Sequence, residues 1–370
     1  MKNNLQKLVA ALRTKKNHKL SMIIGLDGSI DEIVHPVDER QDFKTFTRIP
    51  TMTDFSERIA RAAGLSANME IVSVQTKLGG NGPILSNALL SYGVKISFIG
   101  NIGEPIHPVF RDMADKCEKV YTLGQPAYCL PMEFYDGKFM LNMLDAMNAV
   151  TWEKIKEVVG TPAEIAALVE KCDLLGLENW TELPYMSQIW KGFIDEVFPL
   201  LPNYPDEKKP IAFFDLADPE KRTKADIAEA MELIGKFNTK FRAILGLNEK
   251  ELYGIAKAID VEQGNLKDTT MAVREKLGIY CLVAHPVKEA CCSVEGEYFH
   301  VMGPYVEKPL LTTGAGDNFN AGFTFGMSLG LDPTSALTLG VCTSGFYVSN
   351  AKSPTFDEVV DFADKWSQGL

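Results

Sequence analysis

A glycine-rich turn followed by an acidic residue occupies positions 312–323, which read TTGAGDNFNAGF. Gly314 and Gly316 would let the backbone approach a ligand closely, and the apolar run from Phe319 predicts a buried helix. The free N–H groups at that helix N-terminus would form an anion site, with Asp317 facing it from the first turn. This combination suits phosphoryl transfer, where a base orients a hydroxyl and donors stabilise the moving group. The alternative is a tight turn whose Asp317 only interacts favourably with the helix dipole.

Two further polar segments each follow a predicted strand. The glycine pair at 79–80 comes after the β-branched run 71–74, and Asn248 comes after the apolar run 243–247, with Glu251 three residues later. An asparagine and a glutamate with this spacing could cap a helix and add negative charge to its first turn.

Two aspartates follow the first predicted strand, which covers residues 22–26. Either carboxylate, that of Asp27 or that of Asp31, could accept hydrogen bonds from the hydroxyl groups of a ligand. Asp31 is slightly favoured. Either residue could instead stabilise an Asx-turn.

Apolar strands and helices alternate along most of the chain, which predicts a mostly parallel sheet with helices on both faces. Such a sheet places its functional loops beyond the carboxyl ends of its strands, where the candidate residues lie. The Asp136-Gly137 and Glu295-Gly296 pairs predict two β-hairpins, over residues 132–141 and 290–301.

Two amphipathic helices are predicted near the N-terminus. Residues 1–20 carry apolar side chains at helical spacing ahead of the first strand. Residues 54–64 predict a second helix, with Asp54 and Glu57 in capping-box spacing at its start and Gly64 at its end.

Taken in order, these motifs resemble the signatures of the ribokinase-like (PfkB) carbohydrate kinases. Residues 312–317 are similar to the second signature, D-T-x-G-A-G-D, and residues 79–93 are similar to the first. Residues 248–251 match the family's N-x-x-E segment, and residues 215–222 are a looser match to its D-P-N segment. The resemblance extends over about residues 23–364, which is nearly the whole chain.

This resemblance implies an α/β fold, the ribokinase-like three-layer sandwich with a mostly parallel central sheet and a small β-lid. A single domain would cover residues 1–370, with lid segments at approximately 33–48 and 127–143. The lid would fold over the acceptor, and its apolar face would exclude water or pair with another lid, which implies a homodimer. An ordinary sheet edge is the alternative for the lid.

The resemblance also implies roles for individual residues. Asp317 would be the general base, and the backbone of Gly314, Ala315 and Gly316 would form the anion hole. The nucleotide would be bound by Asn248, Glu251, Thr313, Gly314 and Gly316, with Asn248 and Glu251 organising Mg²⁺ through water. The acceptor would be bound by Gly79, Gly80, Asn81 and one of Asp27 and Asp31.

Three departures from the family pattern affect the expected ligands. Leu311 stands where an aspartate usually helps to hold a monovalent cation, so activation by such a cation is in doubt. Ile84 replaces an asparagine of the first signature, which weakens the expectation of a ribose-like acceptor. The segment 284–289 replaces a glycine-containing nucleotide loop with a proline-containing one. Lys288 could compensate as a point charge, and His285 is expected to be structural.

We therefore expect an ATP- and Mg²⁺-dependent kinase acting on a hydroxyl of a sugar or sugar acid. One alternative is a nucleoside kinase in which Phe134 or Tyr135 stacks on a base. Another is a degenerate kinase that binds a sugar without phosphorylating it. The net charge of -11 argues against nucleic acid or an anionic membrane as partner. Seven cysteines without a CxxC pair indicate reduced thiols and a cytoplasmic location.

Overall fold

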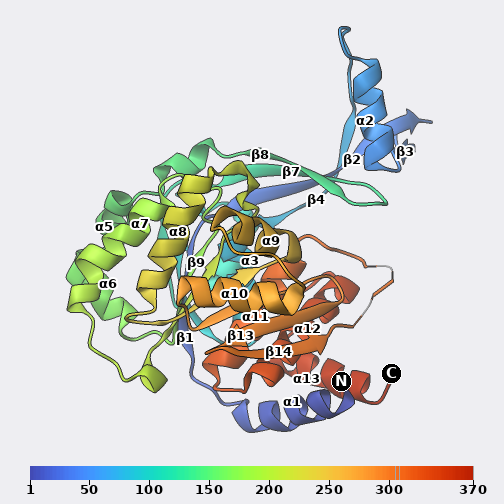
Figure 1. Cartoon of the computed structure of the whole chain (residues 1–370). Coiled ribbons are helices and arrows are strands. Elements are labelled where there is room, and N and C mark those ends of the chain that lie inside the picture. Colours follow the sequence, from blue (N-terminus) through green and yellow to red (C-terminus); the bar gives the residue numbers. More distant parts are fainter. Residues whose placement is uncertain (305, 308, 370) are drawn as a thin grey trace.

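The computed structural model describes residues 1–304, 306–307 and 309–369, and it contains two sheets (Figure 1). The larger sheet has nine strands in the order β14-β13-β12-β11-β10-β9-β1-β5-β6. The strands from β12 to β6 pair in parallel, and the hairpin β13–β14 adds an antiparallel edge. Its strands are β1 (Ser21–Leu26), β5 (Lys95–Gly100), β6 (Lys119–Thr122), β9 (Leu174–Glu178), β10 (Ile211–Asp215), β11 (Arg242–Leu247), β12 (Cys281–Ala284), β13 (Glu289–Val294) and β14 (Glu297–Met302).

Helices cover both faces of this sheet, because successive residues of each strand point to opposite sides. In β1, Ile23 packs into one apolar core, whereas Met22 and Ile24 pack into the other. The core with Ile23 is covered by α5 (Trp152–Val159), α6 (Pro162–Val169), α7 (Met186–Gly192), α8 (Lys224–Phe237), α9 (Glu249–Ala258) and α10 (Leu266–Leu277). The other core is covered by α1 (Lys2–Lys15), α3 (Asn81–Ser91), α4 (Arg111–Lys116), α11 (Ala315–Ser328), α12 (Pro333–Asn350) and α13 (Phe356–Ser367). The predicted three-layer α/β sandwich is confirmed.

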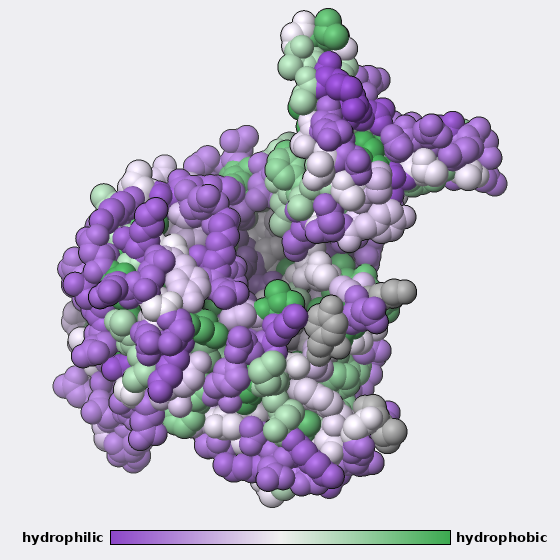
Figure 2. All heavy atoms as spheres, turned by 45° about the vertical axis from the view of Figure 1, so that its right-hand side comes forward, coloured by the Kyte–Doolittle hydropathy of each residue, from purple (hydrophilic) through white to green (hydrophobic). Residues whose placement is uncertain are grey.

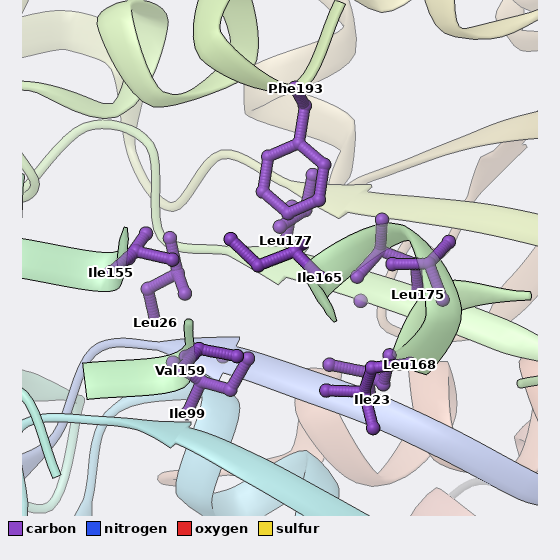
Figure 3. Close-up of a pocket in the computed structure, with 13 residues that line it drawn as sticks. Ile23, Leu26, Ile99, Ile155, Val159, Ile165, Leu168, Leu175, Leu177 and Phe193 are labelled. Atoms are coloured by element: carbon purple, nitrogen blue, oxygen red, sulfur yellow. The ribbon is translucent and has the colours of Figure 1, made fainter. Parts of the chain in front are cut away.

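The first of these cores is closely packed. Figure 3 shows a cavity between β1, β9 and the helices above them, lined by apolar side chains that include Ile23, Leu175 and Phe193. Its volume is about 10 Å³, which is the space of roughly one water molecule at most. A cavity this small and this apolar is a packing defect, so the functional site lies elsewhere.

The smaller sheet forms the lid. It has the strand order β3-β2-β7-β8, with β4 paired to β2. Its strands are β2 (Ser29–Arg40), β3 (Phe46–Arg48), β4 (Ile71–Gly79), β7 (Ala127–Glu133) and β8 (Lys138–Met143). Both predicted lid segments lie in this sheet. The structure adds β4, whose antiparallel pairing with β2 runs from Ser29↔Gly79 to Pro36↔Ile71.

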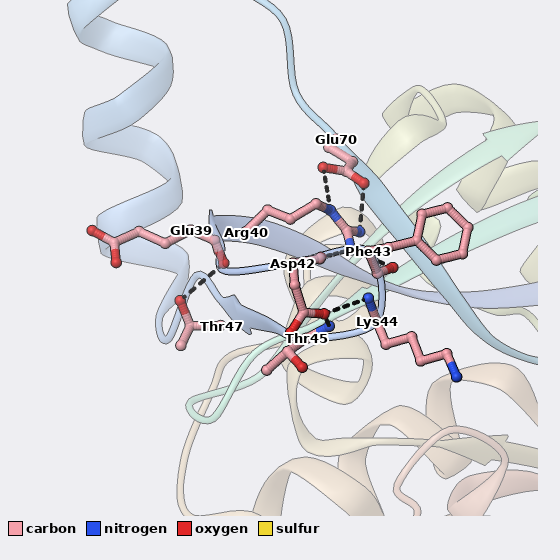
Figure 4. A network of polar contacts seen from close by, with 8 residues as sticks. All are labelled: Glu39, Arg40, Asp42, Phe43, Lys44, Thr45, Thr47 and Glu70. Carbon is pink, nitrogen blue, oxygen red and sulfur yellow. Dashed lines mark hydrogen bonds and ion pairs between the residues drawn. The ribbon is translucent and has the colours of Figure 1, made fainter.

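A projecting arm extends the lid away from the body, formed by β3, α2 (Met52–Arg61) and the chain that returns to β4 (Figures 1 and 2). Polar contacts order the turn at residues 41–45 between β2 and β3, which we call the arm tip (Figure 4). The Arg40 guanidinium donates to both carboxylate oxygens of Glu70, at 3.0 and 2.5 Å, and to the carbonyls of Asp42 and Phe43. The arm is therefore a folded element.

Both predicted N-terminal helices are present. In α1, Leu5, Leu8, Val9 and Leu12 are buried against the body. The predicted start of α2 was wrong, because Thr51 caps the helix and its hydroxyl accepts from the Asp54 amide at 3.1 Å. The helix thus starts at the Thr51–Asp54 pair, three residues before the predicted Asp54–Glu57 pair.

Candidate active site

The glycine-rich turn at 312–316 leads into α11 of the body. It contacts the lid through Thr313. Gly314 precedes α11 with φ +93°, a conformation that favours glycine. A Cβ added there would lie 3.0 Å from the Tyr347 hydroxyl oxygen and 3.3 Å from Ile84 Cγ2. The Tyr347 hydroxyl also donates to the Thr313 carbonyl at 2.7 Å. These contacts fix the turn. The Ala315 N–H donates to the Thr312 carbonyl at 3.1 Å, so the prediction that Ala315 contributes a free donor was wrong. The other N–H groups that begin α11 are available for an anion.

Asp317 lies in that first turn, half-buried. Burial raises the pKa of its carboxyl well above the usual range, and the nearby negative charges of Asp215 and Asp27 raise it further. The ammonium group of Lys138 acts in the opposite direction. A carboxylate with a raised pKa is a stronger base, which is the property that proton abstraction from a hydroxyl requires.

The two candidate acceptor aspartates differ in how their oxygens are used. The Asp27 carboxylate accepts from the backbone amides of Asn81 and Gly82 at 2.9 and 2.8 Å, and from the Asn179 amide at 2.8 Å. It therefore caps the N-terminus of α3. The Asp31 carboxylate accepts from the Ser29 hydroxyl at 3.0 Å through one oxygen, Oδ1. The other Asp31 oxygen, Oδ2, makes no hydrogen bond with the described residues. Asp31 is therefore better placed than Asp27 to bind a ligand.

The glycine pair at the end of β4 is required by these aspartates. A Cβ at Gly79 would lie 1.8 Å from Asp31 Oδ1, and one at Gly80 would lie 2.7 Å from Asp27 Oδ2. Both distances are incompatible with a side chain. The structure thus brings Gly79, Gly80 and Asn81 together with both aspartates.

Asp215 connects the acceptor side of the site to α11. Its carboxylate accepts from the Asn81 amide at 3.2 Å, from the Asn320 amide at 2.7 Å and from the Ala217 backbone amide at 2.8 Å. Sequence reasoning included Asn320 and Asp215 only as parts of motifs and gave neither residue a role. The signal that could have located Asp215 is its position at the carboxyl end of an apolar strand.

Asn248 and Glu251 form the capping box of α9. The Asn248 side chain accepts from the Glu251 amide at 3.0 Å, and one Glu251 oxygen accepts from the Asn248 amide at 2.8 Å. Burial and then the charge of Asp215 raise the pKa of Glu251 to about 8. The capping interpretation is therefore confirmed, while Glu251 also faces the acidic side of the site.

Glu178 is a site residue that sequence reasoning missed. It ends β9 beside Asp215, is fully buried, and neither of its carboxylate oxygens has a hydrogen-bond partner among the described residues. Burial raises its pKa well above the usual range, and Asp215, Asp317 and Asp27 add to the shift. The sequence shows Glu178 only as the last residue of an apolar strand.

The family pattern implies a magnesium ion, and the carboxylates at this edge of the sheet suit one. Glu178, Asp215 and Glu251 offer hard oxygen atoms, which are the donors that Mg²⁺ prefers. Among the described residues, no group of three or more His, Cys, Asp or Glu side chains is placed to hold a metal ion directly.

Two of the departures from the family pattern, Leu311 and the segment 284–289, have physical counterparts. Leu311 packs with Ile33 of the lid and Tyr347 in a small apolar cluster. The His285 ring lies 4.9 Å from the Phe319 ring, and burial lowers its pKa to about 4. A Cβ at Gly316 would lie 3.3 Å from His285 Cε1, so this neutral ring lines the turn. Lys288 is exposed.

The aromatic residues considered for base stacking do not face the site. Phe134 is buried in an apolar cluster with Val34 and Met132 and packs 5.4 Å from Phe55 of the arm. Tyr135 is exposed, with the Arg48 guanidinium 3.9 Å from its ring. The nucleoside alternative thus loses both of its stacking candidates.

Comparison with solved structures defines the class of fold. The chain is similar to an adenosine kinase from Sinorhizobium meliloti, with a TM-score of 0.67, 14% identity and coverage of 94% of this chain and 99% of that one. It is also similar to a ribokinase from Thermotoga maritima, with a TM-score of 0.63, 17% identity and coverage of 94% and 99%. The chain therefore has the ribokinase fold.

Residues 7–366 match the family model described as prokaryotic ketohexokinase, so the chain belongs to that family. It is 29% identical over 344 residues to the ketohexokinase of Haloferax volcanii, covering 92% of this chain and 90% of that protein. The predicted resemblance to carbohydrate kinases is confirmed, and the protein is an ATP-dependent sugar kinase. Within the described residues, none of the helices has the length and apolar character that a membrane span requires.

Proposed function

We propose that this protein transfers the γ-phosphoryl group of ATP to a hydroxyl of a ketohexose, with Asp317 as the general base. The acceptor oxygen would form a bond to the γ-phosphorus as the bond to the β–γ bridging oxygen breaks. The hydroxyl proton would pass to Asp317, and ADP would leave. The observation that carries this proposal is the position of Asp317 in the first turn of α11, where a raised pKa and the free N–H groups coincide.

The acceptor would be held by Asp31, Asn81 and the backbone at 79–80. Asp31 would accept hydrogen bonds from sugar hydroxyls, because one of its oxygens is uncommitted by the contacts described above. Asp27 would instead hold the start of α3 in place. A ketohexose as acceptor is supported by the family and by the name of the Haloferax volcanii relative.

Mg²⁺ would be organised by Asn248 and Glu251 through water, with Glu178 and Asp215 nearby. When bound, the ion would neutralise charge on the nucleotide phosphates. Leu311 fills an apolar cluster in place of a cation ligand. A monovalent cation is accordingly no part of this proposal.

The lid would also join two copies of the chain in a homodimer. Phe139, Leu141 and Met143 alternate along β8 on the face opposite Lys138, and their exposed fractions are 47%, 46% and 53%. An exposed apolar strand of this kind is an expected contact surface. Residues 1–370 would act as one domain in the reducing cytoplasm, where free cysteines such as those of the described chain are stable.

The substrate assignment is tested by measuring ADP formation with ketohexoses, aldohexoses, sugar acids and nucleosides, together with mass spectrometry of the product. We expect a ketohexose to give the highest kcat/KM and a product heavier by one phosphoryl group. Faster turnover of a nucleoside would contradict the proposal. Ketohexose binding without turnover of any acceptor would favour a sugar-binding protein.

A further inference from the structure

Two lysines from different lid strands meet at the same residue of the body. Lys77 comes from β4 and Lys138 from β8, and these strands are separated in the sheet by β2 and β7. The Lys77 ammonium donates to the Thr313 carbonyl at 3.2 Å, and the Lys138 ammonium donates to the Thr313 hydroxyl at 3.0 Å. Thr313 is the residue directly before Gly314, so both charges lie at the entrance of the anion-binding turn.

The charges around these lysines show what the pair faces. Both ammonium groups interact electrostatically with Asp31 and Asp317, and also with Glu133. They also repel each other, and both are half-buried. The pair thus acts on both the aspartate proposed to bind the acceptor and the proposed base, from its position beside Thr313 and the anion-binding turn.

An anion between the two lysines would relieve their mutual repulsion. It would also lie within reach of the N–H groups that begin α11. A ketohexose is uncharged, so the acceptor itself does not supply that anion. The phosphoryl group in transit does, because its oxygens carry negative charge throughout the transfer.

We propose that Lys77 and Lys138 are catalytic residues that contact the transferred phosphoryl group and complete the anion hole from the lid side. This inference rests on the proposed function. The lysines keep their protons throughout, and the acceptor proton still goes to Asp317. Because both charges belong to the lid, a displaced lid removes both from the site at once, and the body alone offers an incomplete anion hole.

The test compares Lys77→Met and Lys138→Met with the arginine variants at the same positions. Lys44→Met serves as the control, because Lys44 is exposed on the arm tip. We expect each methionine variant to lower kcat by about 10²–10³-fold, the loss typical of removing one anion-hole donor. Ketohexose affinity, measured by calorimetry without nucleotide, should be unchanged, and binding of the complex with ADP and aluminium fluoride should weaken. The arginine variants should recover part of kcat, and Lys44→Met should match the wild type.

Two results would overturn the inference while leaving the proposed function intact. Methionine variants that are folded and keep wild-type kcat would show that the lysines only stabilise the lid. Variants with weaker ketohexose binding and an unchanged kcat would show that the lysines hold the acceptor. If the wild type itself turned over no acceptor, the proposed function would fail instead. Arginine variants supply the comparison should a methionine variant not fold.

Discussion

The body and the lid contribute opposite charges to the site. The body supplies a row of carboxylates at the carboxyl edge of the central sheet, including Asp215, Glu251 and the base candidate Asp317. The lid supplies the ammonium groups of Lys77 and Lys138. A row of buried carboxylates suits a metal ion and a proton acceptor, whereas a pair of ammonium groups suits phosphoryl oxygens. The difference supports our proposal that the transferred group is bound where the two regions meet.

The turn of the body that the lid lysines contact, residues 312–316, should tolerate change least. Gly314→Ala places a Cβ 3.0 Å from the Tyr347 hydroxyl in a backbone conformation that disfavours alanine. We expect kcat to fall about 10²-fold, the effect of an approximately 1 Å displacement in an active site. The free energy of unfolding should fall by about 1–3 kcal/mol. Steady-state kinetics and urea denaturation measure the two effects.

Gly278→Ala is the matched control for that substitution. Gly278 also has a positive φ, +63°, but an added Cβ would contact nothing within 4 Å. It should lower the free energy of unfolding by about 1 kcal/mol and leave kcat unchanged. Equal kinetic effects of the two substitutions would mean that the contacts of Gly314 are irrelevant to catalysis.

The carboxylate row should set the pH dependence of activity. Asp215 is the largest electrostatic cause of the raised pKa of Asp317, after burial. In Asp215→Asn the pKa of Asp317 should fall, so the acid limb of the kcat/KM profile should move to lower pH. An acid limb that does not move would show that Asp215 does not control the pKa of the base. The amide also changes the hydrogen bonds to Asn81 and Asn320, so kcat should fall at all pH values.

The free energy of unfolding of the metal-free protein should decrease as pH rises from about 4.5 toward 8. The pKa of Glu251 is about 8 in the folded state and 4.5 in an unfolded chain, so the folded state binds more protons between these values. Stability from this residue is therefore present below about pH 4.5 and lost as pH rises toward 8. The total is a few kcal/mol, at about 1.4 kcal/mol per pKa unit. Thermal unfolding in EDTA should show a flatter pH dependence for Glu251→Gln, and an identical dependence would contradict this assignment.

Substitutions on the outer face of the lid should change the oligomeric state and have the smallest effect on kcat. Leu141→Glu places a charge on the exposed apolar stripe of β8 and should convert a dimer to a monomer. Phe43→Ser, at the exposed arm tip, should leave the dimer intact. Light scattering after gel filtration measures both. A monomeric wild type would remove the proposed lid pairing.

The body half of the site could be predicted from the sequence because its motifs are local. Residues 312–317 form one turn, and Asn248 and Glu251 lie within one turn of α9. The hairpin at Glu295-Gly296 was equally predictable, since both residues adopt positive φ, at 50° and 91°. The start of α2 was not, because two capping spacings overlap there and only the structure distinguishes them.

The lid half could not be predicted in the same way. Lys77 and Lys138 meet only because β4 and β8 belong to one sheet, and that pairing is not encoded in a short motif. Glu178 posed a similar problem, since a glutamate ending an apolar strand gives no sign that its carboxylate stays buried. Both cases depend on contacts between distant parts of the chain.

The central claim is that Asp317 removes the proton from the acceptor, and single-turnover phosphoryl transfer by Asp317→Asn tests it most directly. With a ketohexose that the wild type phosphorylates, we expect the rate to fall by about 10²–10⁴-fold. Binding of the ketohexose and of ATP, measured by calorimetry, should be retained. A variant that transfers the phosphoryl group at close to the wild-type rate would contradict the account.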